Sequence, residues 1–390
     1  VDAAREALGA PEPFYASEET RAFFRQRKEE LAQSYEEWNA TFEAWKAANP
    51  ESAEILANGL AKNWGTAEAV LANVPEFPTD KAAATRATGG EALNAVAQQI
   101  PLLVAGSADL HGSTKNYLKE MGDFDLACPE GRNLYFGIRE HAMGAIVNGM
   151  AYYGLFKASG ATFLTFSDYM RPPVRLAALA HLPVFHVWTH DSVGVGEDGP
   201  THQPVECTAA LRCMPNLTVL RPGDAEETAA AVAYAATCNT GPVGLVLSRQ
   251  NLPNLSSIPV ATRRAGTLKG GYIARRETES LDQIILATGS ELYLALTAAE
   301  QLGGGCRVVS LPSFELFEAQ PEAYREEVLP STCRKRVAIE AGVSSIWGKY
   351  VGLDGKVVGI DRFGLSAPGA QVFAECGITV ENLVATAQAL

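Results

Sequence analysis

An apolar run, LPVFHVW at residues 182–188, leads into the polar stretch HDSVGVGEDGPTHQP at residues 190–204. The run predicts a buried strand, and the glycines and prolines of the stretch prevent a regular element after it. In open α/β sheets, ligands bind just beyond the carboxyl ends of the strands. A loop at that place that is rich in histidines and acids predicts a functional site more than a structural turn.

Helices and strands are predicted to alternate on both sides of this loop. Strands are expected at 102–106, 133–136, 163–166, 217–220 and 243–247, and helices at 88–99, 138–153, 174–182 and 225–237. After a break around 253–267, strands are expected at 283–287, 307–311, 336–340 and 357–360, with helices at 291–302 and at the end, the last entered through Thr379. Such alternation is typical of a mostly parallel sheet with helices on both faces.

The first part of the chain differs from the rest. It begins with Val1 and a predicted helix over Asp2 to Leu8, which favours a start inside a larger protein, as a proteolytic or truncated fragment or one product of a split gene. Residues from Ser17 to about Gly65 are charged and helical, and Trp38, Phe42 and Trp45 form a stripe on one face that we interpret as a docking surface. The predicted fold is therefore a helical linker over 1–78 and two consecutive α/β/α domains with mostly parallel sheets, over 79–255 and 256–390.

Composition excludes several classes of function. A chain of 390 residues, 47% of them hydrophobic, can build more than one core. Its net charge of -13 argues against a nucleic-acid or anionic-membrane partner. No run of about 18 apolar residues predicts a transmembrane helix, and no signal-peptide pattern is present. The seven scattered cysteines indicate reduced thiols in a cytoplasmic protein.

Several single residues have an ordinary interpretation. Glu140 falls in the first turn of a predicted helix, where an acid commonly offsets the helix dipole. Phe163, Phe166 and Tyr169 recur every three residues, as core aromatics often do. Residues 193–199 fit a loose Gly-x-Gly-x-x-Gly pattern, but the pattern opens no helix, so we reject a dinucleotide site.

The combined motifs resemble transketolase over essentially the whole chain. The most specific ones occur in order along the sequence: Arg139-Glu140-His141, Phe163 to Tyr169, residues 190–204, Ser248 to Leu252, Leu311 to Phe317 and Gly359 to Gly364. One such motif would be weak evidence, whereas six in order are specific. The resemblance implies a thiamin diphosphate-binding fold.

The resemblance also implies an activity and its partners. Members of this family use thiamine diphosphate to move a two-carbon ketol unit from a ketose phosphate of the xylulose 5-phosphate type to an aldose phosphate of the ribose 5-phosphate or erythrose 4-phosphate type, in the pentose phosphate pathway. The chain is similar to their pyrimidine-binding and C-terminal domains, and a homodimer is expected. Their Gly-Asp-Gly metal motif is missing, since Gly122-Asp123 and Gly223-Asp224 are not followed by glycine. The ligands of Mg²⁺ or Ca²⁺ are thus expected on an absent N-terminal diphosphate-binding domain, and none in this chain.

Residue roles follow from the same resemblance. Glu140 is similar to the acid that hydrogen-bonds the aminopyrimidine ring and so provides a base beside the reactive carbon. Phe163, Phe166 and Tyr169 would form the wall around that ring, and Asp109 would reach the cofactor region across a dimer. His202 would act near the reacting oxygens. The implied substrate residues are Arg86, Ser113, His190, Asp198, His202 and Arg249, in which the arginines suit a phosphate because their planar fork binds it bidentately.

Two other hypotheses stay open at this point. The donor could differ, as in dihydroxyacetone synthase or deoxyxylulose-phosphate synthase, although the loop at 190–204 and Arg249 favour transfer between sugar phosphates. Alternatively, the chain could be a non-catalytic, dimer-forming fragment, because the half that would hold the diphosphate is missing.

Overall fold

The computed structural model describes residues 1–390, and the chain divides into two compact units, Val1–Asn58 and Gly59–Leu390. The first unit contains α1 (Asp2–Ala7), α2 (Glu18–Ala48) and most of α3 (Pro50–Leu60). The side chain of Ser17 caps α2 by accepting a hydrogen bond from the backbone N–H of Thr20. No residue of this unit is buried.

The predicted stripe on α2 is present, and its rings stack on one another. Successive ring centroids are 6.1 Å apart for Tyr35 and Trp38, 5.0 Å for Trp38 and Phe42, and 5.8 Å for Phe42 and Trp45. The helical spacing of three and four residues puts these side chains on one face. What docks on that face stays a prediction.

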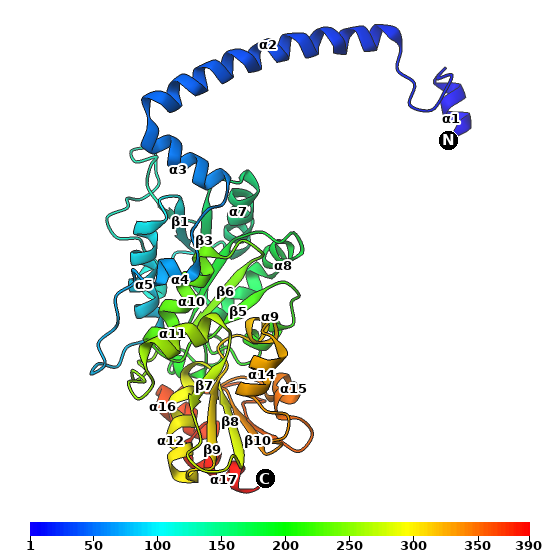
Figure 1. Cartoon of the computed structure of the whole chain (residues 1–390). Coiled ribbons are helices and arrows are strands. Elements are labelled where there is room, and N and C mark those ends of the chain that lie inside the picture. The colour runs from blue at the N-terminus through cyan, green and yellow to red at the C-terminus, as the bar shows by residue number, and fades with distance from the viewer. The chain divides into compact units, whose positions relative to one another are not determined.

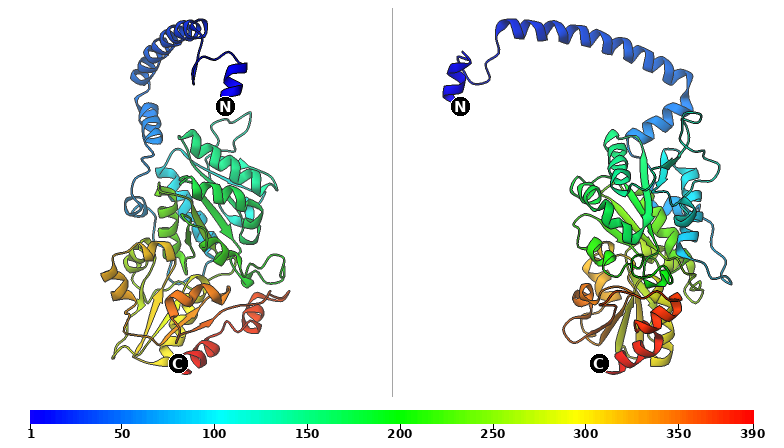
Figure 2. Two further views of the ribbon diagram at one scale, coloured as in Figure 1. Left: turned by 90° about the vertical axis from the view of Figure 1, so that its right-hand side faces the viewer. Right: turned by 180° about the vertical axis from the view of Figure 1, so that it is seen from behind.

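The second unit contains two sheets, shown from three directions in Figures 1 and 2. The first sheet has the order β2-β1-β3-β4-β6-β5, and every pair of neighbours is parallel. Its strands are β1 (Leu103–Ser107), β2 (Asn133–Tyr135), β3 (Lys157–Phe163), β4 (Phe185–Thr189), β5 (Thr218–Leu220) and β6 (Val243–Leu247). The central strands β1, β3, β4 and β6 are buried along their whole length.

Helices cover both faces of this sheet, as the alternation predicted. Leu93 and Val96 of α5 and the alanine-rich residues 229–236 of α10 pack on one face. Met143 and Val174, from α7 and α8, belong to the core on the other face. The helices concerned are α4 (Ala67–Leu71), α5 (Thr85–Gln99), α6 (His111–Thr114), α7 (Glu140–Tyr153), α8 (Arg171–Leu179), α9 (Cys207–Arg212) and α10 (Ala225–Thr237).

The second sheet has the order β11-β10-β8-β9-β7. Its strands are β7 (Tyr272–Arg275), β8 (Gln283–Ala287), β9 (Cys306–Ser310), β10 (Arg336–Ile339) and β11 (Lys356–Val358). All neighbours are parallel except β7 and β9, which run antiparallel at the sheet edge. The prediction of two mostly parallel sheets is therefore confirmed.

This sheet too is covered on both faces. Residues of α12 and α17 form one core with Ile285 and Ile339, whereas Phe317 and Trp347 form the opposite core with Leu286. The helices are α11 (Val260–Leu268), α12 (Leu292–Leu302), α13 (Phe314–Glu318), α14 (Glu322–Val328), α15 (Gly348–Val351), α16 (Gly369–Glu375) and α17 (Val380–Gln388). Thr379 caps α17, as predicted, by accepting from the N–H of Asn382.

Two local predictions were wrong. The strand expected at 163–166 is β3, which ends at Phe163, and the 3₁₀ helix η1 (Leu164–Met170) follows. The body of β3 reads KASGATF, so small and polar residues conceal a buried strand. The break expected at 253–267 contains α11, whose arginines and glycine hide its buried face.

The larger unit begins at Gly59, before residue 78. Trp64, Val70, Leu71 and Val74 belong to the core of the first sheet. The domain boundaries at 78 and 255 stay a prediction. None of the helices is both long and apolar enough to cross a membrane.

Candidate functional site

His190 lies at the centre of the site, one residue beyond β4. Its backbone φ is +62°, a left-handed conformation that is uncommon for histidine. The imidazole lies over Phe163, with the ring centroids 3.5 Å apart. Its Nδ1 is 2.8 Å from the hydroxyl of Thr189, and its Nε2 is 3.3 Å from the guanidinium of Arg86. Because arginine can only donate, Nε2 accepts and the proton is on Nδ1.

The surroundings keep this imidazole neutral. Burial, the positive charges of Arg86 and Arg249, and a contribution from His202 together lower the pKa of His190 to about 3. The ring is therefore uncharged at neutral pH, with its accepting nitrogen directed at Arg86.

Two arginines lie beside His190 and form a cationic group. Arg86 is in the first turn of α5, where its guanidinium donates to the carbonyl oxygen of Ser113 at 2.8 Å. Burial lowers the pKa of Arg86, and so does the nearby charge of Arg249. Arg249 is exposed and follows β6, the neighbour of β4 in the sheet. Two cations that destabilise each other bind an anion favourably, and a phosphate fits the guanidinium fork.

Phe163, Phe166 and Tyr169 form a continuous aromatic wall. Phe163 and Phe166 stack at 5.9 Å, and Phe166 and Tyr169 stack at the same distance. The 3₁₀ conformation of η1 causes this, because side chains three residues apart eclipse in a helix of three residues per turn. Phe163 is buried, with 8% exposure, as expected of a core aromatic, whereas Tyr169 is 65% exposed. His202 meets Phe166 edge-on at 5.4 Å.

Three predicted site residues are not joined to this group by a hydrogen bond, ion pair or ring contact. Glu140 is the first residue of α7 and is only 8% exposed. Asp109 follows β1 with a φ of +64° and is exposed. Asp198 is exposed in the loop after η2 (Val193–Val195). The remaining predicted residues form one constellation: Arg86, Ser113, His190, His202 and Arg249 with the aromatic wall.

The loop at 190–204 is held by the second sheet's domain. The amide of Gln203 donates to the carbonyl oxygens of Gly196 and Leu365. Ser366 donates its hydroxyl proton to the carbonyl oxygen of Glu197 at 2.6 Å. A cavity of about 480 Å³ lies beside the loop, lined by Gly194, by Arg249 and by residues of α12 and α16.

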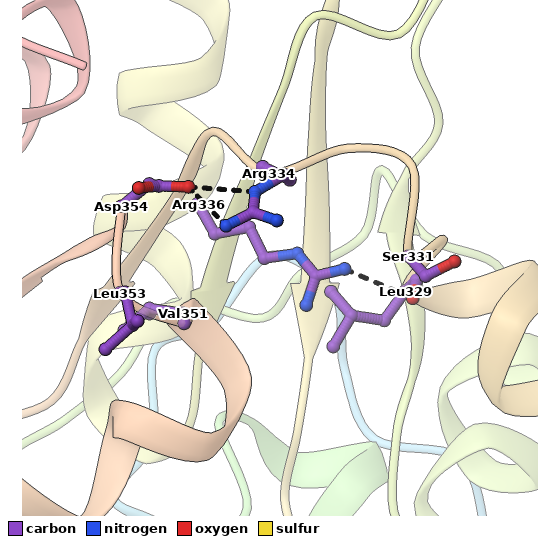
Figure 3. A pocket seen from close by; sticks show the side chains of 8 residues that line it. Leu329, Ser331, Arg334, Arg336, Val351, Leu353 and Asp354 are labelled. Atoms are coloured by element: carbon purple, nitrogen blue, oxygen red, sulfur yellow. Dashed lines mark hydrogen bonds and ion pairs between the residues drawn. The ribbon is translucent and has the colours of Figure 1, made fainter.

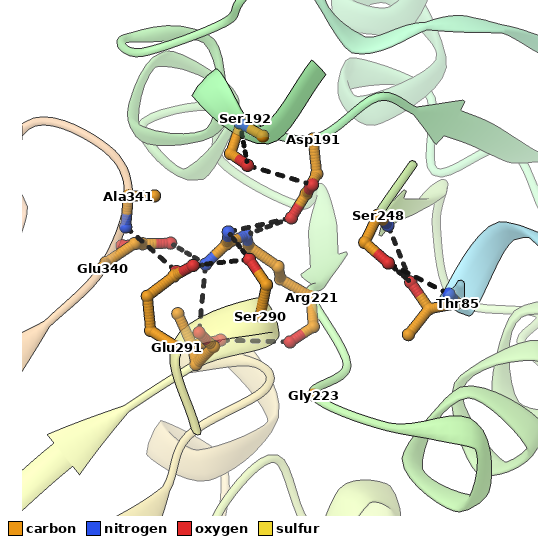
Figure 4. Close-up of polar contacts among 12 residues, drawn as sticks. Thr85, Asp191, Ser192, Arg221, Gly223, Ser248, Ser290, Glu291, Glu340 and Ala341 are labelled. Carbon is orange, nitrogen blue, oxygen red and sulfur yellow. Dashed lines mark hydrogen bonds and ion pairs between the residues drawn. The ribbon is translucent and has the colours of Figure 1, made fainter. Parts of the chain in front are cut away.

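Sequence reasoning missed a group of buried charges behind the loop. Arg221 contacts Asp191 from the loop, and Glu291 and Glu340 from the second sheet's domain (Figure 4). Arg221 directly follows β5, so its place at the carboxyl end of a strand was a usable signal. Its three partners could not be identified, because they are far apart in sequence.

Two other features lie outside this constellation. A hollow of about 320 Å³ lies at the start of β10 (Figure 3). There Arg336 donates to the carbonyl oxygens of Cys333, Tyr350 and Pro330, and Arg334 is paired with Asp354. Elsewhere Asp168, Glu206 and Cys207 lie close enough to hold a metal ion. Burial raises the pKa of the Cys207 thiol to about 12, so a metal ion bound there would have to displace its proton.

Comparisons with known proteins match both parts of the larger unit. Residues 81–254 match the family "Transketolase, pyrimidine binding domain", and residues 270–379 match the "Transketolase-like TK C-terminal domain". A transketolase of Dictyostelium discoideum is 57% identical over 385 residues, which are 98% of this chain and 58% of that protein.

The chain belongs to the transketolase family.

Solved structures of transketolases agree with this membership. A transketolase of Pichia stipitis, described as a complex with xylulose 5-phosphate, matches with a TM-score of 0.88 and 36% identity, over 97% of this chain and 56% of that one. A split-gene transketolase, described as an inactive β4 tetramer, matches with a TM-score of 0.63 and 27% identity, over 78% of this chain and 97% of that one. This chain therefore spans little more than half the length of most of these transketolases.

Proposed function

We propose that this chain provides the aminopyrimidine wall and the sugar-phosphate clamp of a thiamine diphosphate-dependent transketolase. The observation that carries the proposal is the position of His190. One face of its ring lies on Phe163, and its Nε2 faces Arg86. A single residue thus joins a surface suited to a flat heterocycle to a group suited to a phosphate.

The residues of the chain fit one half of the cofactor. The stacked rings of Phe163, Phe166 and Tyr169 suit an aminopyrimidine, and Tyr169 leaves the wall open on one side. Glu140 is an enclosed carboxyl without a hydrogen-bond partner, and in this proposal it accepts from a protonated ring nitrogen. When bound, the cofactor supplies the electron sink that C–C bond cleavage needs.

The substrate would lie between the histidines and the arginines. In this proposal Arg86 and Arg249 bind the phosphate, with Ser113 beside them, and Asp198 reads a sugar hydroxyl. A phosphate would draw the guanidinium of Arg86 away from Nε2 of His190. His202, edge-on to Phe166, would move or hold a proton at the reacting oxygens. The donor and acceptor would be sugar phosphates, as with the xylulose 5-phosphate of the Pichia protein.

The proposed partners complete the site. A diphosphate-binding domain would provide the ligands of Mg²⁺ or Ca²⁺, and a homodimer would bring Asp109 toward the cofactor of the other subunit. The seven free thiols support a reducing compartment such as the cytoplasm.

A second candidate is a non-catalytic assembly module. The split-gene relative, 97% of which is covered by this chain, is described as an inactive tetramer. Under this alternative, the residues around His190 are present but take no part in catalysis. Calorimetry of this chain with thiamine diphosphate and Mg²⁺ can refute the second candidate. Weak binding of thiamine diphosphate that does not depend on Mg²⁺ is expected under both candidates. Tight, metal-dependent binding would refute the non-catalytic module and would require diphosphate ligands within the chain.

Substitution of Glu140 tests the catalytic proposal. In the complete protein that contains this chain, Glu140→Ala should lower ketol transfer from xylulose 5-phosphate to ribose 5-phosphate by about 10²- to 10⁴-fold, the usual range for a proton-transfer group. Glu322→Ala is the matched control, because Glu322 is also the first residue of a helix but lies in α14. Near-normal turnover of the Glu140 variant, or a preference for pyruvate as the donor, would contradict the proposal.

A further inference from the structure

A buried group of charges connects the two domains of the larger unit (Figure 4). The guanidinium of Arg221 lies 2.8 Å from a carboxylate oxygen of Asp191, 2.5 Å from Glu291 and 3.5 Å from Glu340. It also donates to the hydroxyl of Ser290 at 3.2 Å. The side chains of Arg221, Asp191 and Glu291 are 1%, 2% and 0% exposed. Every side of the guanidinium therefore meets an acceptor.

Stability alone does not explain this group. Replacing buried ion pairs by apolar residues is often neutral or stabilising, because desolvation of the charges offsets their attraction. Arg212 pairs with Glu340 at 2.9 Å, so two guanidinium groups face three carboxyl groups. Burial raises the pKa of Glu291, although Arg221 opposes that shift. Every N–H group of Arg221 has an acceptor, and buried polar contacts of this kind fix one arrangement of the side chains. Nε and Nη2 of Arg212 have no hydrogen-bond partner, so the fixed part of the network is centred on Arg221.

The contacts of Asp191 lead directly to the proposed substrate loop. One carboxylate oxygen of Asp191 contacts Arg221, and the other accepts from the hydroxyl of Ser192 at 3.3 Å. That hydroxyl in turn accepts from the N–H of Gly194 at 3.2 Å. The preceding residue, His190, has the unfavourable φ of +62°. Such a conformation persists only where the surrounding contacts determine it.

We propose that Arg221 is a positioning residue through which the C-terminal domain holds His190 in its site conformation. Glu291 and Glu340 fix the guanidinium from one domain, and Asp191 transmits that position to the loop in the other. The inference rests on the proposed function, because it concerns the same site. The inference gives the C-terminal domain a role in sugar-phosphate binding, although the carboxyl groups of Glu291 and Glu340 lie behind the loop.

The first experiment uses this chain alone. The six histidines allow ¹⁵N NMR of the imidazoles, and amide hydrogen exchange reports on the loop. In Arg221→Met, we expect His190 to lose the Nδ1–H signature and amides 190–195 to exchange at least tenfold faster. Arg221→Lys keeps the charge but has fewer hydrogen-bond donors. Its exchange rates at amides 190–195 should lie between those of Arg221→Met and those of the wild type.

The matched control is Arg263→Met. Arg263 forms an equally buried ion pair with Asp224, with side-chain exposures of 1% and 0%, but it does not contact the loop. A similar loss of stability is expected, with His190 and amides 190–195 unchanged. Wild-type signals in Arg221→Met, or equal changes in the control, would overturn the proposal. If Arg221→Met does not fold, Asp191→Asn is measured in its place. Wild-type signals of His190 and of amides 190–195 in that variant would also overturn the proposal.

The second experiment measures the complete protein. Arg221→Lys and Asp191→Asn should raise KM for a phosphorylated ketol donor at least tenfold, and should change KM for an unphosphorylated donor less than twofold. Equal effects on both donors would indicate general damage and would overturn the positioning role. If the wild type transfers no ketol unit, the proposed function fails, whereas the NMR result on His190 still decides this inference.

Discussion

At the scale of single residues, His190 takes its properties from side chains far away in the sequence. Arg86 and Phe163 contact its ring, and Arg249 lowers its pKa. The sequence could predict this meeting in part, because carboxyl ends of neighbouring parallel strands share one edge of the sheet. It could have placed Arg221 at the carboxyl end of a strand, but it could not predict that Arg221 is buried, since its three acidic partners are far apart in sequence.

His186 should make the chain acid-sensitive. It is fully buried in β4, neither ring nitrogen has a hydrogen-bond partner, and burial lowers its pKa from 6.5 to about 4. The unfolded chain binds a proton at His186 more readily than the folded chain does, so protonation of this residue favours unfolding. With respect to His186, the folded state keeps its full stability above pH 6.5 and loses stability as the pH falls toward 4. The loss amounts to about 3 kcal/mol.

Urea denaturation at several pH values checks this expectation. His186→Leu should be less sensitive than the wild type between pH 6.5 and 4, the window set by the two pKa values. The control is His181→Asn, because His181 is exposed and asparagine tolerates its φ of +53°. The expectation fails if His186→Leu and the wild type lose stability in parallel over that window.

At the scale of elements, two helix caps differ in burial. Thr379 caps α17 at the surface with one hydrogen bond of 3.2 Å, and it was predictable as a threonine before an apolar pattern. Asp224 caps α10 with two bonds, of 3.0 and 2.9 Å, and its other oxygen binds Arg263 and the N–H of Leu255. The contacts of this other oxygen could not be predicted, because they depend on how α11 packs against α10.

The two caps should therefore contribute unequally to stability. Thr379→Ala should reduce the free energy of unfolding by about 1 kcal/mol, the usual value of a cap. Asp224→Ala should reduce it by about 3–5 kcal/mol, because Arg263 is left buried without an opposite charge, with only the amide oxygen of Asn254 as an acceptor. Urea midpoints measure both. Asp224→Asn keeps the cap but not the charge, so it should fall between them; equal losses for alanine at both sites would refute the argument.

At the scale of the whole molecule, periodicity predicted the two covered parallel sheets but not their strand order. The order β2-β1-β3-β4-β6-β5 depends on which crossovers pack best, and no local pattern records that. The antiparallel edge strand β7 was missed, since four residues carry little periodicity. The core role of Trp64 and Val70 was also missed, because both lie in a segment that read as a linker.

Removal of residues 1–48 should leave the larger unit intact. None of these residues is buried, so the deletion exposes no core, and the thermal midpoint should shift by less than about 2 °C. A deletion through residue 71 is the contrast, because it removes Trp64, Val70 and Leu71 from the core of the first sheet. Scanning calorimetry measures both. A large shift for the shorter deletion would show that the first unit stabilises the second.

The aromatic stripe on α2 has a spectroscopic consequence. Both tryptophans of the first unit are exposed, Trp38 by 55% and Trp45 by 37%. The three of the larger unit are buried: Trp64 and Trp188 in the cores of the first sheet, and Trp347 in a core of the second. A water-soluble quencher such as acrylamide should therefore quench the red-shifted fluorescence of Trp38 and Trp45 in α2 before that of the buried tryptophans. The light that remains would report on the folded sheets alone, so one unlabelled sample carries separate optical signals for its two units.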